Sequence, residues 1–184
     1  MHDPFRATPS TAAREVGGKA VLYQSLAEEL DALLRGETDP VANAANAAAA
    51  IYHGLAELNW VGFYFLRGEE LVLGPFQGQP ACVRIPLGKG VCGTAATARR
   101  SVLVPDVHAF PGHIACDANS RSELVVPLLI KDGLARDGLA EDCLLGVLDL
   151  DSPMTGRFDA VDQAGCEALA AIVVRHLAPR RSPG

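Results

Sequence analysis

The sequence predicts an α+β fold, with one central antiparallel sheet of five to six strands and the N- and C-terminal helices on one face. Apolar residues recur at helical spacing near both ends of the chain. Short runs rich in Val, Leu and Phe, separated by turn residues, fill the middle. The 184 residues are enough for a single domain with a sizeable core. With the terminal helices on one face, a long loop and a short helix remain to close a pocket on the other.

Two helices are expected before the first strand. Residues 1–16 are rich in turn-forming and polar types and are expected to form a flexible leader. Between Lys19 and Arg35 leucines follow a helical repeat, which ends at a glycine. Asp39 is a typical helix N-cap residue and Pro40 is typical of a first helical turn. They predict that a second, alanine-rich helix covers residues 41–58.

The rest of the chain is predicted to alternate between strands and helices. In order we expect a hairpin at 59–68 and 70–78, a strand at 81–88, a short helix at 90–100, strands at 101–107, 123–133 and 144–153, and a helix at 158–177. A polar loop at 106–122 is long for a structureless connection, and such loops are often functional. The 134–143 insertion exceeds what a hairpin needs. The domain is therefore expected at 17–178, followed by a disordered tail at 179–184.

Charge and cysteine usage exclude several classes of function. The net charge is −6 and no basic run exceeds two arginines, which argues against nucleic acid and anionic membrane surfaces as partners. No apolar stretch approaches the ~18 residues of a membrane span, and the start of the chain lacks a signal-sequence pattern. We therefore expect a cytoplasmic protein with reduced thiols. Five cysteines, none paired as C-x-x-C, suit catalytic or inert thiols better than a disulfide framework.

Two acidic residues stand on one face of the last predicted strand. Because side chains alternate along a strand, Asp149 and Asp151 share one face while Leu148 and Leu150 share the other. Acids on an otherwise apolar strand are costly unless they bind something. This pattern predicts a site for a cation, either a metal or a substrate ammonium. The alternative is a solvated face on which Asp151 caps the following turn.

The first predicted strand carries an aromatic pair on one face. Trp60, Gly62 and Tyr64 share one face of this strand, and Val61 and Phe63 share the other. With a glycine between them, the two rings can form a shallow wall. Such walls suit thioether or methyl groups and cations. Ordinary core packing of both rings is the alternative.

The cysteines differ in their local setting. Cys116 lies in the polar loop, where a thiol can be reached by solvent and react. Cys82 is expected on a strand and Cys92 in a short helix, so each could equally be a small apolar core residue. Cys143, in the insertion, is interpreted as incidental, and Cys166 follows the apolar stripe of the last helix and is expected in the core.

Familiar metal-binding, cofactor-binding and serine-nucleophile motifs do not occur in the sequence. His108, His113 and Cys116 are close in sequence, but their spacing is not a familiar zinc pattern and no second cysteine pair accompanies them. The glycine-rich stretch around Lys89 lacks the spacing of a phosphate-binding loop. No G-x-S-x-G motif supports a serine nucleophile.

Four segments together resemble a known family. The segments NWVGFYF, GPFQGQPACVRIPLGKGVCGTAA, VPDVHAFPGHIACDANSRSELVVPL and GVLDLDSP resemble the free methionine-(R)-sulfoxide reductases, which have the GAF fold. The resemblance runs from about residue 17 to about residue 176. It departs from the family at the 134–143 insertion, where a tighter hairpin is usual, and Cys143 and Cys166 are not part of the family pattern.

The resemblance implies roles for the motif residues. Cys116 would be the attacking thiol, Cys82 its main resolving partner and Cys92 a second thiol in the exchange. Trp60 and Tyr64 would face the substrate methyl group. The carboxylates around the sulfoxide and the amino group would be Glu123, Asp149 and Asp151. The implied reaction consumes free methionine-(R)-sulfoxide and regenerates the thiols with thioredoxin, without a cofactor.

The same residues allow alternatives for the chemistry, the assembly and the function. The sequence does not choose between Cys82 and Cys92 as the resolving thiol, and it does not assign the proton donor among the acids. A homodimer is one option for the assembly. Two other functions compete with the reductase. One is a ligand-binding sensor, because the GAF fold alone does not determine function, and the other is a thiol switch without a substrate.

Overall fold

A computed structural model describes residues 16–112, 119–130 and 143–177. The elements are, in order, α1 (Val16–Leu34), α2 (Pro40–Gly54), β1 (Trp60–Arg67), β2 (Glu70–Gly78), β3 (Arg84–Pro86), α3 (Gly90–Ala98), β4 (Val102–Val104), the 3₁₀ helix η2 (Val107–Ala109), β5 (Ser122–Ile130), β6 (Cys143–Ser152) and α4 (Ala160–Leu177). The predicted leader apart from Val16, the predicted tail, and the insertion apart from Cys143 lie outside the described residues. Residues 113–118 of the polar loop, which include Cys116, also lie outside them.

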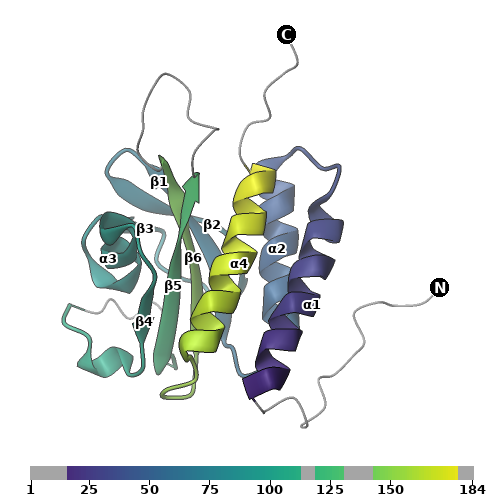
Figure 1. Cartoon of the computed structure of the whole chain (residues 1–184). Helices are drawn as coiled ribbons and strands as arrows, with labels where there is room; N and C mark the ends of the chain where they lie inside the picture. The colour runs from purple at the N-terminus through teal and green to yellow at the C-terminus, as the bar shows by residue number, and fades with distance from the viewer. Residues whose placement is uncertain (1–15, 113–118, 131–142, 178–184) are drawn as a thin grey trace.

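The strands form one six-stranded sheet in the order β3-β2-β1-β6-β5-β4, with antiparallel pairing throughout. Helices α1, α2 and α4 cover one face, and α3 lies on the other side of the sheet (Figure 1). The predicted fold class is therefore confirmed. In the described part of the chain, no helix is both long and apolar enough to cross a bilayer.

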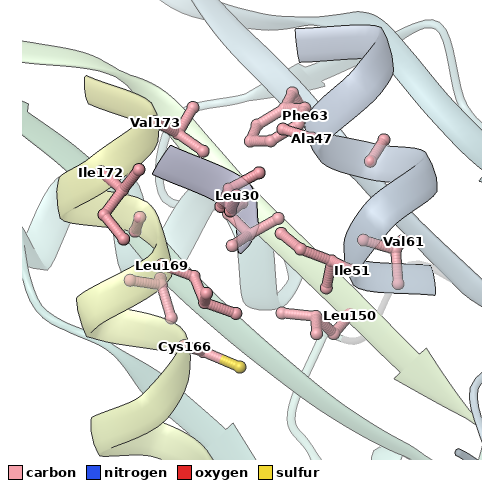
Figure 2. Close-up of a cluster of buried hydrophobic side chains, with 14 of the residues drawn as sticks. Leu30, Ala47, Ile51, Val61, Phe63, Leu150, Cys166, Leu169, Ile172 and Val173 are labelled. Atoms are coloured by element: carbon pink, nitrogen blue, oxygen red, sulfur yellow. The ribbon is translucent and has the colours of Figure 1, made fainter. Parts of the chain in front are cut away.

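The main core lies between the sheet and the three-helix layer. Val61 and Phe63 of β1 and Leu150 of β6 point toward Leu30 of α1 and Ile51 of α2 (Figure 2). All five side chains are fully buried. Each contributes roughly 1.5–3 kcal/mol by leaving water. The alternate residues of β1 and β6 must then face the opposite side of the sheet, where the acids and the aromatic pair were expected.

A buried carboxylate joins α1 to α4 within the helix layer. Asp162 is fully buried and accepts hydrogen bonds from the Tyr23 hydroxyl at 3.0 Å and from Arg157 Nη1 at 3.1 Å. The Lys19 ammonium contacts its other oxygen. Cys166 lies beside this group with its Sγ 3.7 Å from the Tyr23 hydroxyl, and burial raises the pKa of its thiol to about 12. A buried, protonated thiol is inert, which agrees with the core role expected for Cys166.

Three predicted elements are clearly shorter than expected. The strand predicted at 101–107 covers only Val102–Val104, and Val107 already belongs to the 3₁₀ helix η2. The second helix stops at Gly54, four residues before the predicted end, because Leu55 is already extended and its N–H closes the last turn on Ile51 O. The third strand covers Arg84–Pro86 only, so Cys82 precedes a strand and does not lie on one.

Candidate functional site

The predicted acids lie side by side on neighbouring strands. Asp151 of β6 pairs with Glu123 of β5 on one side and with Trp60 of β1 on the other, so the three residues form a row across the sheet. Asp149 lies two residues away on β6, opposite Gly62. The flanking leucines of β6 belong to the main core. The predicted split of β6 into an acidic face and an apolar face is therefore confirmed.

An aromatic wall stands beside the acids. The rings of Trp60 and Tyr64 are stacked with centroids 5.9 Å apart, and Phe76 of β2 also stacks on Trp60, with centroids 5.3 Å apart. Gly62 makes this arrangement possible, because a Cβ at that position would lie 2.4 Å from the Trp60 ring and 2.4 Å from the Phe76 side chain. Both Trp60 and Tyr64 are almost fully buried. The two rings thus form an aromatic wall and are also packed as core residues. Phe76 belongs to the same aromatic cluster, although the sequence did not indicate it.

The polar atoms of the same two rings hold the chain that leads to Cys82. Trp60 Nε1 donates to the carbonyl oxygen of Gln79 at 3.1 Å, and the Tyr64 hydroxyl donates to the carbonyl oxygen of Cys82 at 2.9 Å. Residues 79–82 lie outside any helix or strand. These two side-chain bonds therefore position a segment that the sheet ladder does not hold.

A small pocket, partly open to solvent, lies between this segment and the sheet. It is lined by Trp60, Tyr64, Gln79, Pro80, Ala81, Asp149 and Asp151. Sequence reasoning missed the three lining residues that precede Cys82, because none carries ionisable or nucleophilic chemistry. The structure thus brings the aromatic pair and two of the three acids to one cavity.

Cys92 lies behind the acids and away from solvent. It is 3% exposed on α3, and its S–H points to Glu123 Oε1 with a sulfur–oxygen distance of 3.9 Å. Helix α3 packs closely here because Gly93 has no side chain, and a Cβ there would lie 2.5 Å from the carbonyl oxygen of Pro86. Cys92 is therefore a buried thiol beside the acids, and its part in the thiol exchange stays a prediction.

The other described cysteines lie in different environments. Cys82 is partly exposed next to the pocket-lining Ala81. Cys143 is exposed at the start of β6. The predicted attacking thiol, Cys116, lies outside the described residues, so its role stays a prediction.

Burial and mutual repulsion keep protons on the inner groups of the site. Glu123 and Asp149 are each 6% exposed. Burial, together with the charges of Asp149 and Asp151, raises the pKa of Glu123 well above its usual range. Burial raises the pKa of Asp149 to about 7. Burial and the same acids raise the pKa of the Cys92 thiol well above 9. Near neutral pH the site therefore holds carboxylic acids that can donate a proton.

Comparison with known proteins places this site in a family. The GAF domain family matches residues 29–177. The free methionine-R-sulfoxide reductase of Escherichia coli is 46% identical over 160 residues, which cover 87% of this chain and 91% of that protein. The chain belongs to the GAF family and, within it, to the free methionine-R-sulfoxide reductases. It is an oxidoreductase.

Solved structures agree with this assignment. The Neisseria meningitidis free methionine-R-sulfoxide reductase, solved in complex with its substrate, is 43% identical with a TM-score of 0.77 and covers 86% of this chain and 90% of its own. A Burkholderia vietnamiensis protein, provisionally described as a GAF sensor protein, is 58% identical with a TM-score of 0.78 over 86% of this chain and 94% of its own. The sequence-based resemblance to the reductases is confirmed.

Proposed function

We propose that this protein reduces free L-methionine-(R)-sulfoxide to methionine, with Cys116 as the attacking thiol and a disulfide as the oxidised product. The observation that carries the proposal is the pocket in which stacked aromatic rings face a group of acids on adjacent strands. Relatives named for this activity support the choice of substrate.

The pocket suits the two ends of this substrate. The rings of Trp60 and Tyr64 offer an apolar surface to the S-methyl group. Asp151, which lines the pocket and is only partly buried, binds the substrate ammonium. A methionine sulfoxide residue within a peptide has no ammonium at this position. The acid at the pocket wall thus accounts for a preference for the free amino acid.

The inner acids activate the sulfoxide. A sulfoxide sulfur is a weak electrophile until its oxygen is protonated, and Glu123 or Asp149 supplies that proton because its raised pKa keeps it protonated near neutral pH. The Cys116 thiolate then attacks sulfur. Oxygen passes to Cys116 as sulfenic acid and methionine is released; Cys116 gives up the two electrons that reduce the sulfoxide.

Cys82 resolves the sulfenic acid. The partly exposed Cys82 belongs to the segment that lines the pocket, whereas Cys92 is buried and its raised pKa leaves little thiolate for attack. Condensation of the Cys82 thiol with sulfenic acid releases water and forms the Cys82–Cys116 disulfide. A dithiol donor such as thioredoxin then reduces that disulfide by thiol exchange.

The first experiment measures dithiothreitol-dependent release of methionine from free methionine-R-sulfoxide, with the S epimer and N-acetylated R substrate run in parallel. Turnover of the free R form alone is the expected result. Equal turnover of the N-acetylated substrate would contradict the ammonium-binding role of the acids. No turnover of any substrate by the fully reduced chain would favour the sensor interpretation.

A second experiment tests the thiols. Cys116→Ser is expected to abolish methionine release, and Cys82→Ser is expected to release one methionine per chain with thioredoxin as donor and to stop as a sulfenic acid that dimedone traps. Cys143→Ser is the matched control and is expected to turn over normally, because Cys143 lies outside the pocket. Normal multiple turnover by Cys82→Ser would refute the resolving role. Formation of a disulfide without any methionine release would favour a thiol switch.

A further inference from the structure

Three potential metal-ligand side chains converge behind the pocket. Cys92 Sγ, a carboxylate oxygen of Glu123 and a carboxylate oxygen of Asp149 all lie within 4.8 Å of one another. They come from three separate elements, α3, β5 and β6, and each side chain is more than nine-tenths buried. Within the described ranges, no other set of three His, Cys, Asp or Glu side chains converges in this way.

One pair of these atoms is spaced nearly as two ligands of a tetrahedral ion are. Zinc bonds of ~2.3 Å to sulfur and ~2.1 Å to oxygen place ligand atoms about 3.6 Å apart. The distance from Cys92 Sγ to Glu123 Oε1 is 3.9 Å. Contraction by a few tenths of an ångström would bring this pair to bonding positions. Side-chain rotation alone can supply a movement of that size.

An unsatisfied acceptor points independently to a ligand. Asp149 Oδ1 is buried and has no hydrogen-bond partner among the described residues. A buried carboxylate oxygen without a partner is costly, and a cation would satisfy it. Asp149 also lines the solvent-accessible pocket, so an ion has a route to the cluster.

Charge and ligand type select the kind of ion. Glu123 and Asp149 repel each other when both are ionised, and a doubly charged cation between them removes that repulsion. A thiolate beside carboxylates favours zinc or cadmium, whereas magnesium and calcium prefer sites made only of oxygen.

We infer that Cys92, Glu123 and Asp149 form a binding site for one zinc or cadmium ion, and that the bound ion excludes the sulfoxide from the pocket. The site is inhibitory and plays no part in the reaction. Metal binding itself does not depend on the proposed function. Only the statement about inhibition rests on it, because Asp149 belongs to both the metal cluster and the pocket wall.

The test titrates the reduced, metal-free full-length chain with cadmium chloride and no substrate. Thiolate-to-cadmium charge transfer in the ultraviolet is the readout, and calorimetry with zinc gives the stoichiometry. The exposed thiol of Cys143 and the reactive thiol expected at Cys116 would each bind metal on their own, so the reference protein carries both Cys116→Ser and Cys143→Ser. In that background we expect one ion per chain and a charge-transfer band that disappears with Cys92→Ser.

Further variants separate this site from adventitious binding. Asp149→Asn, which keeps the shape of the side chain, is expected to weaken cadmium binding at least ~tenfold. Cys82→Ser is the control thiol variant and is expected to bind as the reference does. Circular dichroism of each variant checks that it is folded.

Three outcomes would overturn the inference. They are a charge-transfer band that persists in Cys92→Ser, cadmium affinity that is unchanged in Asp149→Asn, and magnesium binding with an affinity equal to that of cadmium. Because metal binding is measured without substrate, its absence leaves the reductase proposal standing. If the ion binds, zinc is expected to raise KM for the sulfoxide without changing kcat, and inhibition that excess substrate does not relieve would contradict the exclusion of substrate.

Discussion

Replacing Asp149 by Asn should remove a pH-dependent loss of stability. The folded-state pKa of Asp149 is raised to about 7, whereas the ordinary value is 3.8. The unfolded chain therefore releases this proton at a lower pH than the folded chain does. Between pH 4 and 7 the folded state binds more protons, so the free energy of unfolding falls as pH rises and levels off above pH 7. Asn cannot ionise, and the variant should lack this decline.

The size of the effect follows from the shift in pKa. A rise from 3.8 to about 7 is ~3 pH units, and each unit corresponds to ~1.36 kcal/mol. The wild-type chain should thus lose up to ~4 kcal/mol of unfolding free energy between pH 4 and 8 through this group. Relative to wild type, the Asn variant should gain by the same amount over that range.

The assay is urea-induced unfolding of the reduced chain, with a chelator present, at intervals from pH 4 to 9. Asp159→Asn is a control with the opposite sign. The pKa of Asp159 is lowered to about 2, mainly by the hydrogen bond from Lys19, so its charge stabilises the fold above pH 4 and that contribution is lost on acidification. Because Asp159 is 55% exposed, the effect should be small. Parallel stability curves for wild type and Asp149→Asn from pH 4 to 7 would refute the reasoning.

Three other substitutions test separate parts of the structure. Tyr64→Phe removes the hydrogen bond to the Cys82 carbonyl oxygen, which contributes ~1 kcal/mol to holding Cys82 in place. Formation of the disulfide should therefore slow about fivefold. Rapid-quench kinetics should show that the first methionine release is affected less, and Tyr52→Phe on α2 is the unaffected control. Gly146→Ala would place a Cβ 2.1 Å from the carbonyl oxygen of Tyr64. The free energy of unfolding measured in urea should therefore fall by ~1–3 kcal/mol, and an unchanged urea midpoint would contradict this close contact. Asp162→Ala removes the buried carboxylate shared by Lys19 and Arg157, which keep Asp159 and Glu57 as their remaining partners. Calorimetry should show a loss of ~2–3 kcal/mol, because charge-assisted hydrogen bonds are lost, and a loss below ~1 kcal/mol would mean that solvent replaces them.

The periodicity of the sequence was sufficient to predict the faces of the central strands. Trp60 and Tyr64 on β1 and Asp149 and Asp151 on β6 lie opposite the helix layer as alternation predicts, because a strand has only two faces and the leucines and valines fix which one is buried under the helices. Helix α2 was placed by its cap, since Asp39 accepts the free N–H groups of the first turn.

The surroundings of the pocket could not be predicted from the sequence. Whether Cys92 faces the acids depends on how the short helix α3 docks, and nine residues of mostly small side chains carry no strong periodicity. The third strand was predicted too long because Cys82 and its neighbours resemble a strand in composition. Their backbone groups are instead held by side chains of β1, and such contacts between distant segments leave no local signal.

The double use of Trp60 and Tyr64 limits how this protein can diverge. Each ring lines the pocket, and each polar tip fixes the backbone near Cys82. A substitution that reshapes the pocket for a bulkier side chain would therefore also displace the thiol proposed to regenerate the enzyme. Specificity and recycling are not independent traits in this scaffold, so a laboratory selection for new substrates should find paired changes in β1 and in residues 79–82 more often than single ones.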